Sequence, residues 1–198
     1  MPHPQTLIYL HGFNSSPQSR KATLCAAYLA AHHPDVKLLV PTLPIDPLSA
    51  VAEVAKIIEE QSLLSHVGLI GSSLGGYYAL YLAERYGLKA VLVNPALMPY
   101  KLLVDYLGIN VNQYTGMTYE LQPRHIDDLL SLQTKAPSLP KNIFVVTQTG
   151  DEVLPYQEAI TLLPLSPFWI QPGGDHAFVD FDCVLPAIVH FLLAPSRI

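Results

Sequence analysis

Three side chains of this sequence could together carry out nucleophilic catalysis: Ser73, Asp151 and His176. A serine hydroxyl becomes a nucleophile when a neighbouring base removes its proton, and that base needs an acid to hold its ring. The serine, the acid and the histidine follow one another in the chain order of triads that are built on open α/β sheets. The sequence therefore predicts a Ser-His-Asp triad, provided that the fold brings the three residues together.

The serine lies in the stretch GSSLGG, between an apolar run and a segment with helical character. Gly71, Ser73 and Gly75 fit the pattern G-x-S-x-G of a nucleophile elbow, a sharp turn from strand to helix that exposes the serine. Ser72 would need a glycine two positions earlier, where an isoleucine stands. Neighbouring chain passes close to such a turn, so side chains at the glycine positions would clash. We therefore expect Ser73, and not Ser72, to be the nucleophile.

The acid and the base follow two later apolar runs. Asp151 comes after the run at residues 142–149, where a buried carboxylate could orient an imidazole. Glu152 is the rival, but Asp151 has the better place before a V-x-P turn, and we expect Glu152 to be a solvated neighbour. His176 lies in the loop GGDHAF, where a base can move slightly between the nucleophile and the leaving group. Asp175 is adjacent to His176 in sequence and is poorly placed to bind its ring.

Two backbone N–H groups are the predicted oxyanion hole. Hydrolases with a nucleophile elbow use the N–H that follows the nucleophile and one N–H from the loop after an early strand. Here these belong to Leu74 and to Phe13 in HGFNSSP. Backbone donors suit the task because they are rigid and point to where negative charge develops. We expect His11 and Asn14 to brace this loop rather than to react, and the role of His125 stays open.

The composition argues against several other classes of function. Half of the 198 residues are hydrophobic and only 14% are charged, which favours an internal parallel sheet covered on both faces. The net charge is −5 and the 11 Lys and Arg are scattered, so nothing indicates a nucleic-acid or anionic-membrane partner. Cys25 and Cys183 match no metal spacing and are predicted to be reduced and buried. No membrane span or signal peptide is evident, so we expect a soluble, cytoplasmic protein without metal or cofactor.

Short apolar runs alternate with helix-like segments along the chain. Strands are expected at residues 6–10, 36–40, 67–70, 89–94, 142–149 and 167–172, and helices at 18–33, after Pro47, at 74–86 and at 182–193. This alternation predicts an α/β protein, a doubly wound and mostly parallel sheet of six strands in a single domain that spans residues 1–198. Reactive groups of such sheets collect at the carboxyl ends of the strands, and the three candidate residues follow their strands there.

Residues 95–141 are the exception to the short links between elements. Connections of this length are often lids or binding loops. The segment begins with NPALMPY, directly after the strand next to the nucleophile, so it should emerge at the mouth of the site. Most of its apolar residues are expected to bury two short helices, but a substrate pocket also needs an apolar wall. We therefore expect a small helical cap over Ser73, in which Met98 and Tyr100 set the acyl-chain preference.

Seven segments, taken in order, resemble the YqiA-type family of small bacterial α/β-hydrolase esterases. They are IYLHGFNSSPQS, GSSLGGYYA, NPA, YTG, RHIDDL, QTGDEVL and GGDHAF. The resemblance covers most of the chain and implies a compact α/β-hydrolase fold. It also implies a serine esterase acting on acyl esters, or acyl thioesters, with Ser73, Asp151 and His176 as its triad. Such a triad needs no cofactor or metal.

Two other functions stay open at this point. The same triad serves lyases and acyltransferases, in which water is excluded or replaced by another acceptor. A non-catalytic ligand receptor could share the fold, but it has no need of an intact triad. The expected partner is a small-molecule acyl ester or thioester, and the sequence assigns neither the physiological substrate nor an oligomeric state.

Overall fold

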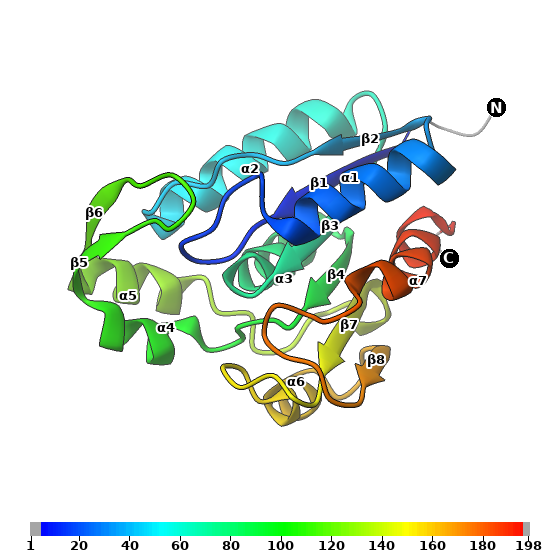
Figure 1. Cartoon of the computed structure of the whole chain (residues 1–198). Helices are drawn as coiled ribbons and strands as arrows, with labels where there is room; N and C mark the ends of the chain where they lie inside the picture. The colour runs from blue at the N-terminus through cyan, green and yellow to red at the C-terminus, as the bar shows by residue number, and fades with distance from the viewer. Residues whose placement is uncertain (1–4, 196–198) are drawn as a thin grey trace.

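The computed structural model describes residues 5–195 and is built around a six-stranded sheet in the order β2-β1-β3-β4-β7-β8 (Figure 1). Every neighbouring pair of strands is parallel. The strands are β1 (Gln5–Leu10), β2 (Val36–Leu39), β3 (His66–Ser72), β4 (Lys89–Val93), β7 (Ile143–Gln148) and β8 (Phe168–Gln171). All six expected strands are present, which confirms the predicted fold class.

Helices cover both faces of this sheet. They are α1 (Arg20–His32), α2 (Pro47–Ser62), α3 (Leu74–Tyr86), α6 (Tyr156–Leu162) and α7 (Phe181–Leu193). Successive residues of β1 point to opposite faces, as a strand requires. Ile8 and Leu10 join the core formed with α2 and α3, whereas Leu7 and Tyr9 join the core formed with α1 and α7. The apolar runs of the sequence are continuous because the strands are buried on both sides.

Two helix ends follow signals that the sequence carries. The Asp46 carboxylate caps α2 by accepting a 2.9 Å hydrogen bond from the Ser49 N–H, and Pro47 occupies the first turn. Helix α3 ends at Gly87, whose φ of 65° is a left-handed conformation that glycine adopts without strain. The cap at Gly87 ends the helix that starts directly after Ser73.

Residues 95–141 contain α4 (Pro99–Leu102), the 3₁₀ helix η1 (Leu103–Tyr106), a hairpin of β5 (Gly108–Val111) and β6 (Thr118–Leu121), α5 (Pro123–Ser131) and the first residues of the 3₁₀ helix η2 (Pro140–Asn142). Figure 1 shows the first five of these elements together on the side of the molecule away from both termini. The helices were expected, but the hairpin was not. Its strands lie outside the main sheet, and each has only four residues, so the alternation of polar and apolar residues in GINV and TYEL is too short to be a distinct signal.

The hairpin is tied to the loop that follows β1. The Tyr119 hydroxyl donates to the Asn14 side-chain oxygen at 2.5 Å, and the Asn112 side-chain amide donates to the Ser15 carbonyl at 3.0 Å. Asn14 has a φ of 51°, which asparagine tolerates better than most residues. The 95–141 segment is therefore anchored to the loop predicted to supply part of the oxyanion hole.

The two cysteines differ in burial. Cys25 is buried between α1 and the sheet, as predicted, but Cys183 is exposed, so the prediction that both are buried is wrong for Cys183. Position 183 lies on the outer side of α7, while Val184, Leu185 and Ile188 face the core. Within residues 5–195, no helix is both long and apolar enough to cross a membrane.

Candidate active site

Ser73 stands at a strained turn between β3 and α3. Its φ of 55° and ψ of −121° lie in a region that residues other than glycine rarely adopt. A Cβ atom at Gly71 would lie 2.2 Å from the Gly75 carbonyl oxygen, and one at Gly75 would lie 2.1 Å from that of Leu10. Both glycines of the elbow pattern are thus required by close backbone contacts. The turn holds the Ser73 side chain at the carboxyl end of the sheet.

The structure brings the predicted acid and base together. His176 Nδ1 lies 2.9 Å from Asp151 Oδ2 and 3.1 Å from Oδ1. The Asp151 side chain is fully buried, and Oδ1 also accepts hydrogen bonds from the backbone N–H groups of Val153 at 2.9 Å and Leu154 at 2.8 Å. These contacts fix the carboxylate independently of the histidine.

The electrostatics of this pair determine which imidazole nitrogen carries a proton. Burial alone would raise the pKa of Asp151, but the hydrogen bonds from His176, Leu154 and Val153 outweigh it, and the pKa lies below its ordinary value. The ionised carboxylate can only accept hydrogen bonds, so Nδ1 of His176 must be the donor. In the neutral ring, Nε2 is then unprotonated and able to act as a base.

Two buried amide side chains hold the backbone of the His176 loop, residues 172–179. Gln148 Oε1 accepts from the N–H groups of Asp175 at 3.1 Å and Val179 at 3.0 Å, and Nε2 donates to the Val179 carbonyl at 2.8 Å. Asn94 Nδ2 donates to the Asp175 carbonyl at 3.0 Å, and its Oδ1 accepts from the Gln148 N–H at 3.0 Å. Sequence reasoning missed both residues, although each is a polar residue at the carboxyl end of a buried strand.

Two charged residues complete this support. Glu152 Oε2 accepts a 3.0 Å hydrogen bond from the His176 N–H, and Lys21 Nζ donates to the Ala177 carbonyl at 3.0 Å. Glu152 is exposed, as expected, but it is not merely a solvated neighbour because it holds the main chain of the histidine. Asp151 binds the ring and Glu152 binds the backbone, so the two adjacent acids have different structural roles.

Ser73 and His176 both line one mainly apolar cavity of about 210 Å³. From the 95–141 segment, its wall contains Ala96, Pro99, Leu102, Leu103 and Tyr106; Phe13, Leu74, Val153 and Leu154 complete the lining. We call this the apolar cavity.

The expected wall residues Met98 and Tyr100 are not part of that lining. The Tyr100 hydroxyl instead accepts a 2.6 Å hydrogen bond from Gln133 Nε2. The lining residues 99, 102, 103 and 106 follow one helical face, whereas 98 and 100 lie off it. The segment therefore faces the candidate nucleophile as expected, but through other side chains than the two predicted.

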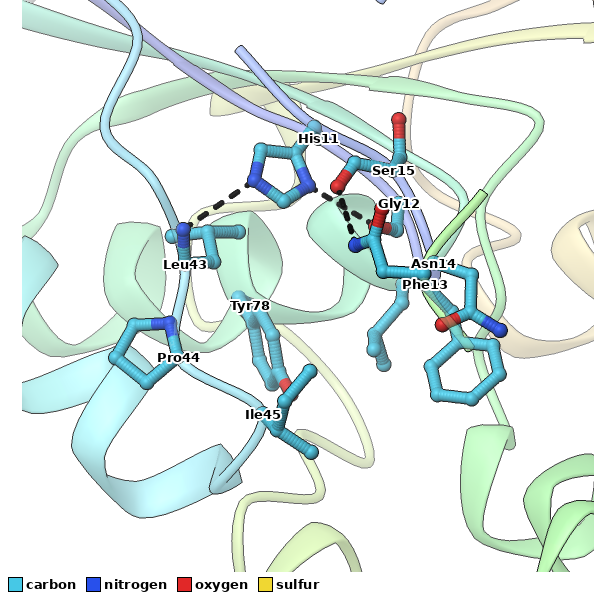
Figure 2. Close-up of a pocket in the computed structure, with 11 residues that line it drawn as sticks. His11, Gly12, Phe13, Asn14, Ser15, Leu43, Pro44, Ile45 and Tyr78 are labelled. Atoms are coloured by element: carbon cyan, nitrogen blue, oxygen red, sulfur yellow. Dashed lines mark hydrogen bonds between the residues drawn. The ribbon is translucent and has the colours of Figure 1, made fainter. Parts of the chain in front are cut away.

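His11 supports the predicted oxyanion loop. Figure 2 shows its ring between Gly12 and Leu43: Nδ1 is 3.0 Å from the Gly12 carbonyl oxygen, and the Leu43 N–H donates to Nε2 at 3.2 Å. Nδ1 must then be the donor, and burial lowers the pKa of His11, which favours this neutral ring. A Cβ atom at Gly12 would lie 3.2 Å from Ser73 Cβ, so the loop passes directly beside the serine.

His125, whose role the sequence left open, is a helix cap. Its Nδ1 accepts a 3.0 Å hydrogen bond from the Gln122 N–H at the start of α5. The residue is buried, and burial is the main cause of its lowered pKa. Beside it, Arg124 forms a 2.6 Å ion pair with Asp46, which connects α5 to α2. His125 therefore belongs to the packing of the 95–141 segment.

The parallel sheet, the flanking helices and the elbow define an α/β-hydrolase fold. Solved structures of this class are similar to the chain. Est1E from Butyrivibrio proteoclasticus with bound ferulic acid has a TM-score of 0.75 and 14% identity, covering 98% of this chain and 90% of its own. Alpha/beta hydrolase domain-containing protein 10 from mouse has a TM-score of 0.72 and 14% identity, covering 95% and 89%. An α/β serine hydrolase without lid from Xanthomonas campestris has a TM-score of 0.62 and 15% identity, covering 100% of this chain and 86% of its own.

The family itself is identified by sequence. The model of a family described as uncharacterised protein family UPF0227 matches residues 6–193. The chain belongs to this family, which confirms the resemblance to the YqiA-type proteins noted above.

Proposed function

We propose that this protein is a serine esterase that hydrolyses acyl esters through Ser73, His176 and Asp151. The observation that supports it most is the 2.9 Å contact between His176 Nδ1 and the buried Asp151 carboxylate, made by a histidine that lines the same cavity as Ser73. A receptor would need neither this orientation of the ring nor a strained serine beside it.

The first half of the reaction forms an acyl-enzyme. His176 Nε2 takes the proton from Ser73 Oγ as Oγ attacks the ester carbonyl carbon. The backbone N–H groups of Phe13 and Leu74 stabilise the oxyanion, and Asp151 stabilises the imidazolium. The proton then passes from His176 to the leaving oxygen as the carbon–oxygen bond breaks.

The second half releases the acyl group. Water enters where the leaving group was, and its oxygen attacks the acyl carbon as His176 takes its proton. The new oxyanion then collapses, the bond from the acyl carbon to Ser73 Oγ breaks, and His176 returns the proton to Oγ. The apolar cavity holds the hydrocarbon part of the acyl group, because side chains such as Leu102 and Leu103 form an apolar wall in which the Tyr106 hydroxyl is one of the few polar groups. Acyl thioesters fit the same steps with sulfur as the leaving atom.

The proposal is tested with a serine-reactive fluorophosphonate and a chromogenic butyrate ester. Ser73→Ala should abolish both turnover and labelling, while the matched control Ser72→Ala should lose much less because Ser72 is buried next to the elbow. Mass spectrometry of the labelled protein should place the phosphonate on Ser73. Labelling of Ser73 without hydrolysis of any ester or thioester across acyl lengths would instead indicate a lyase or an acyltransferase.

A further inference from the structure

A second cavity, of about 240 Å³, also meets Ser73 and His176. Beyond the residues that it shares with the predicted oxyanion loop, its lining includes Ser15, Ser19, Arg20, Lys21, Tyr114 and Ala177. We call it the polar cavity. Hydroxyl groups and two cationic side chains replace the leucines of the apolar cavity, and its lining contains no Asp or Glu.

The two cations are able to bind an additional group. Lys21 Nζ uses one donor on the Ala177 carbonyl, which leaves two of its three donors. Arg20 is exposed, and across residues 5–195 it forms no ion pair. This concentration of positive charge occurs in a chain with a net charge of −5.

Two carboxylates act on Lys21 but lie outside the lining of the polar cavity. Burial lowers the pKa of Lys21, and the negative charges of Asp151 and Asp175 partly oppose that shift. Neither acid lines the cavity, and Asp151 is already hydrogen-bonded to His176. A bound anion would oppose the lowered pKa of Lys21 further, because it favours the charged ammonium.

The start of α1 adds hydrogen-bond donors at the same place. Ser19 is the N-cap residue, yet its side chain makes no capping hydrogen bond, and the first turn of the helix has no acidic residue. The Ser19 hydroxyl has no partner within the described part of the chain, although the residue is only 8% exposed. Backbone N–H groups at a helix start favour a negative group, in addition to the two cations.

We propose that the polar cavity is the leaving-group subsite and that it selects an alcohol or thiol bearing a carboxylate or a phosphate. This rests on the proposed esterase function. The acyl group stays on Ser73 and is held by the apolar cavity, so the departing half of the substrate takes the other cavity that His176 lines. His176 protonates the leaving oxygen or sulfur while the anionic substituent stays unchanged beside Arg20 and Lys21.

The test compares two esters that share an acyl chain: 4-nitrophenyl butyrate and 3-carboxy-4-nitrophenyl butyrate. Both release a nitrophenolate, and the second adds one carboxylate to the leaving group. The readout is the ratio of their kcat/KM values at fixed ionic strength. The double variant Arg20→Gln/Lys21→Met should lower the carboxylated-to-neutral ratio by about tenfold or more, the scale of a hydrogen bond to a charged group.

Lys56→Met is the matched control, because it removes one cation from an exposed position of α2 outside both cavities. It should leave the ratio unchanged. Added salt should lower the wild-type ratio more than that of the double variant, since screening weakens only the interaction that is still present. If the double variant hydrolyses both esters more slowly by the same factor, the cause is the lost hydrogen bond from Lys21 to Ala177 in the His176 loop. Such an equal loss cancels in the ratio.

The source of the anion is distinguished by inhibition. Inorganic phosphate and acetate are compared as competitive inhibitors of the wild type and of Arg20→Gln. The anion that inhibits the wild type more strongly and loses affinity in the variant shows whether the subsite prefers a phosphate or a carboxylate. An unchanged ratio in the double variant, with 4-nitrophenyl butyrate still hydrolysed, would overturn the subsite and leave the esterase intact. Absence of any turnover and of Ser73 labelling would overturn both.

Discussion

Replacement of Asp151 by asparagine tests the catalytic geometry most directly. Asp151 Oδ1 accepts two backbone N–H groups, from Val153 and Leu154, while Oδ2 is the oxygen nearest His176 Nδ1. In Asp151→Asn, the single amide oxygen must remain with the two backbone donors, because the NH₂ group cannot accept from them. The NH₂ group then faces Nδ1 and forces it to be an acceptor.

That tautomer leaves the proton on Nε2, where it prevents His176 from taking the proton of Ser73. Replacement of a triad aspartate by asparagine lowers kcat by about 10⁴ in a well-studied protease, which corresponds to about 5.5 kcal/mol. We expect a loss of that order here, with little change in KM. Glu152→Gln is the matched control: its amide oxygen still accepts the His176 N–H, so kcat should fall less than about tenfold.

Initial rates with a chromogenic butyrate ester, measured between about pH 6 and 9, provide the assay. Thermal unfolding of both variants checks that the fold persists, as the backbone contacts of residue 151 predict. Residual activity of Asp151→Asn should rise with hydroxide concentration, because hydroxide must then remove the Ser73 proton in place of His176. A loss below tenfold in Asp151→Asn, or equal losses at residues 151 and 152, would refute the assignment of the acid.

Two further outcomes are expected. Leu102→Ala should shift the kcat/KM ratio between long and short acyl esters by roughly 1–3 kcal/mol per methylene accommodated, whereas Met98→Ala, outside the apolar cavity, should not. Asp46→Ala should cost about 1–2 kcal/mol in unfolding free energy at pH 7, mainly through the lost α2 cap. Hydrogen bonds from Ser49, opposed by burial and helped by Arg124, hold the pKa of Asp46 at about 2. The contribution of Asp46 to the free energy of unfolding should therefore be complete above about pH 4 and be lost as the pH falls through about 2, which urea titrations at several pH values measure.

Residues whose position depends on local chain geometry could be predicted from the sequence. Gly71 and Gly75 are needed because neighbouring carbonyl oxygens lie where their Cβ atoms would be, and this need is visible as a pattern around Ser73. Asp151 and His176 each follow a buried apolar run, and parallel strands place such positions along one edge of the sheet. The contact between them required only that their strands, β7 and β8, be neighbours.

Residues whose role depends on which way a short helix faces could not be predicted from the sequence. The apolar stretch from residue 97 to 107 offers several candidate faces, and α4 is only four residues long before the 3₁₀ helix begins. A change from 3.6 to 3 residues per turn alters which side chains face inward. Met98 and Tyr100 were therefore plausible from composition, but Pro99, Leu102 and Tyr106 line the cavity.

The support of the His176 loop explains how the proposed base can be held in place on a loop rich in glycine. Gly173 and Gly174 adopt φ values of 71° and 77°, and a Cβ at Gly174 would lie 1.9 Å from Gln148 Oε1, so glycine is needed where this amide enters the loop. Gln148 and Asn94 hold the backbone through hydrogen bonds, while the ring itself hydrogen-bonds to Asp151. The position of the loop and the tautomer of the ring are therefore set by different residues. We therefore expect a change at Gln148 to displace the whole ring, whereas Asp151→Asn should alter which ring nitrogen carries the proton while Gln148 and Asn94 still hold the loop.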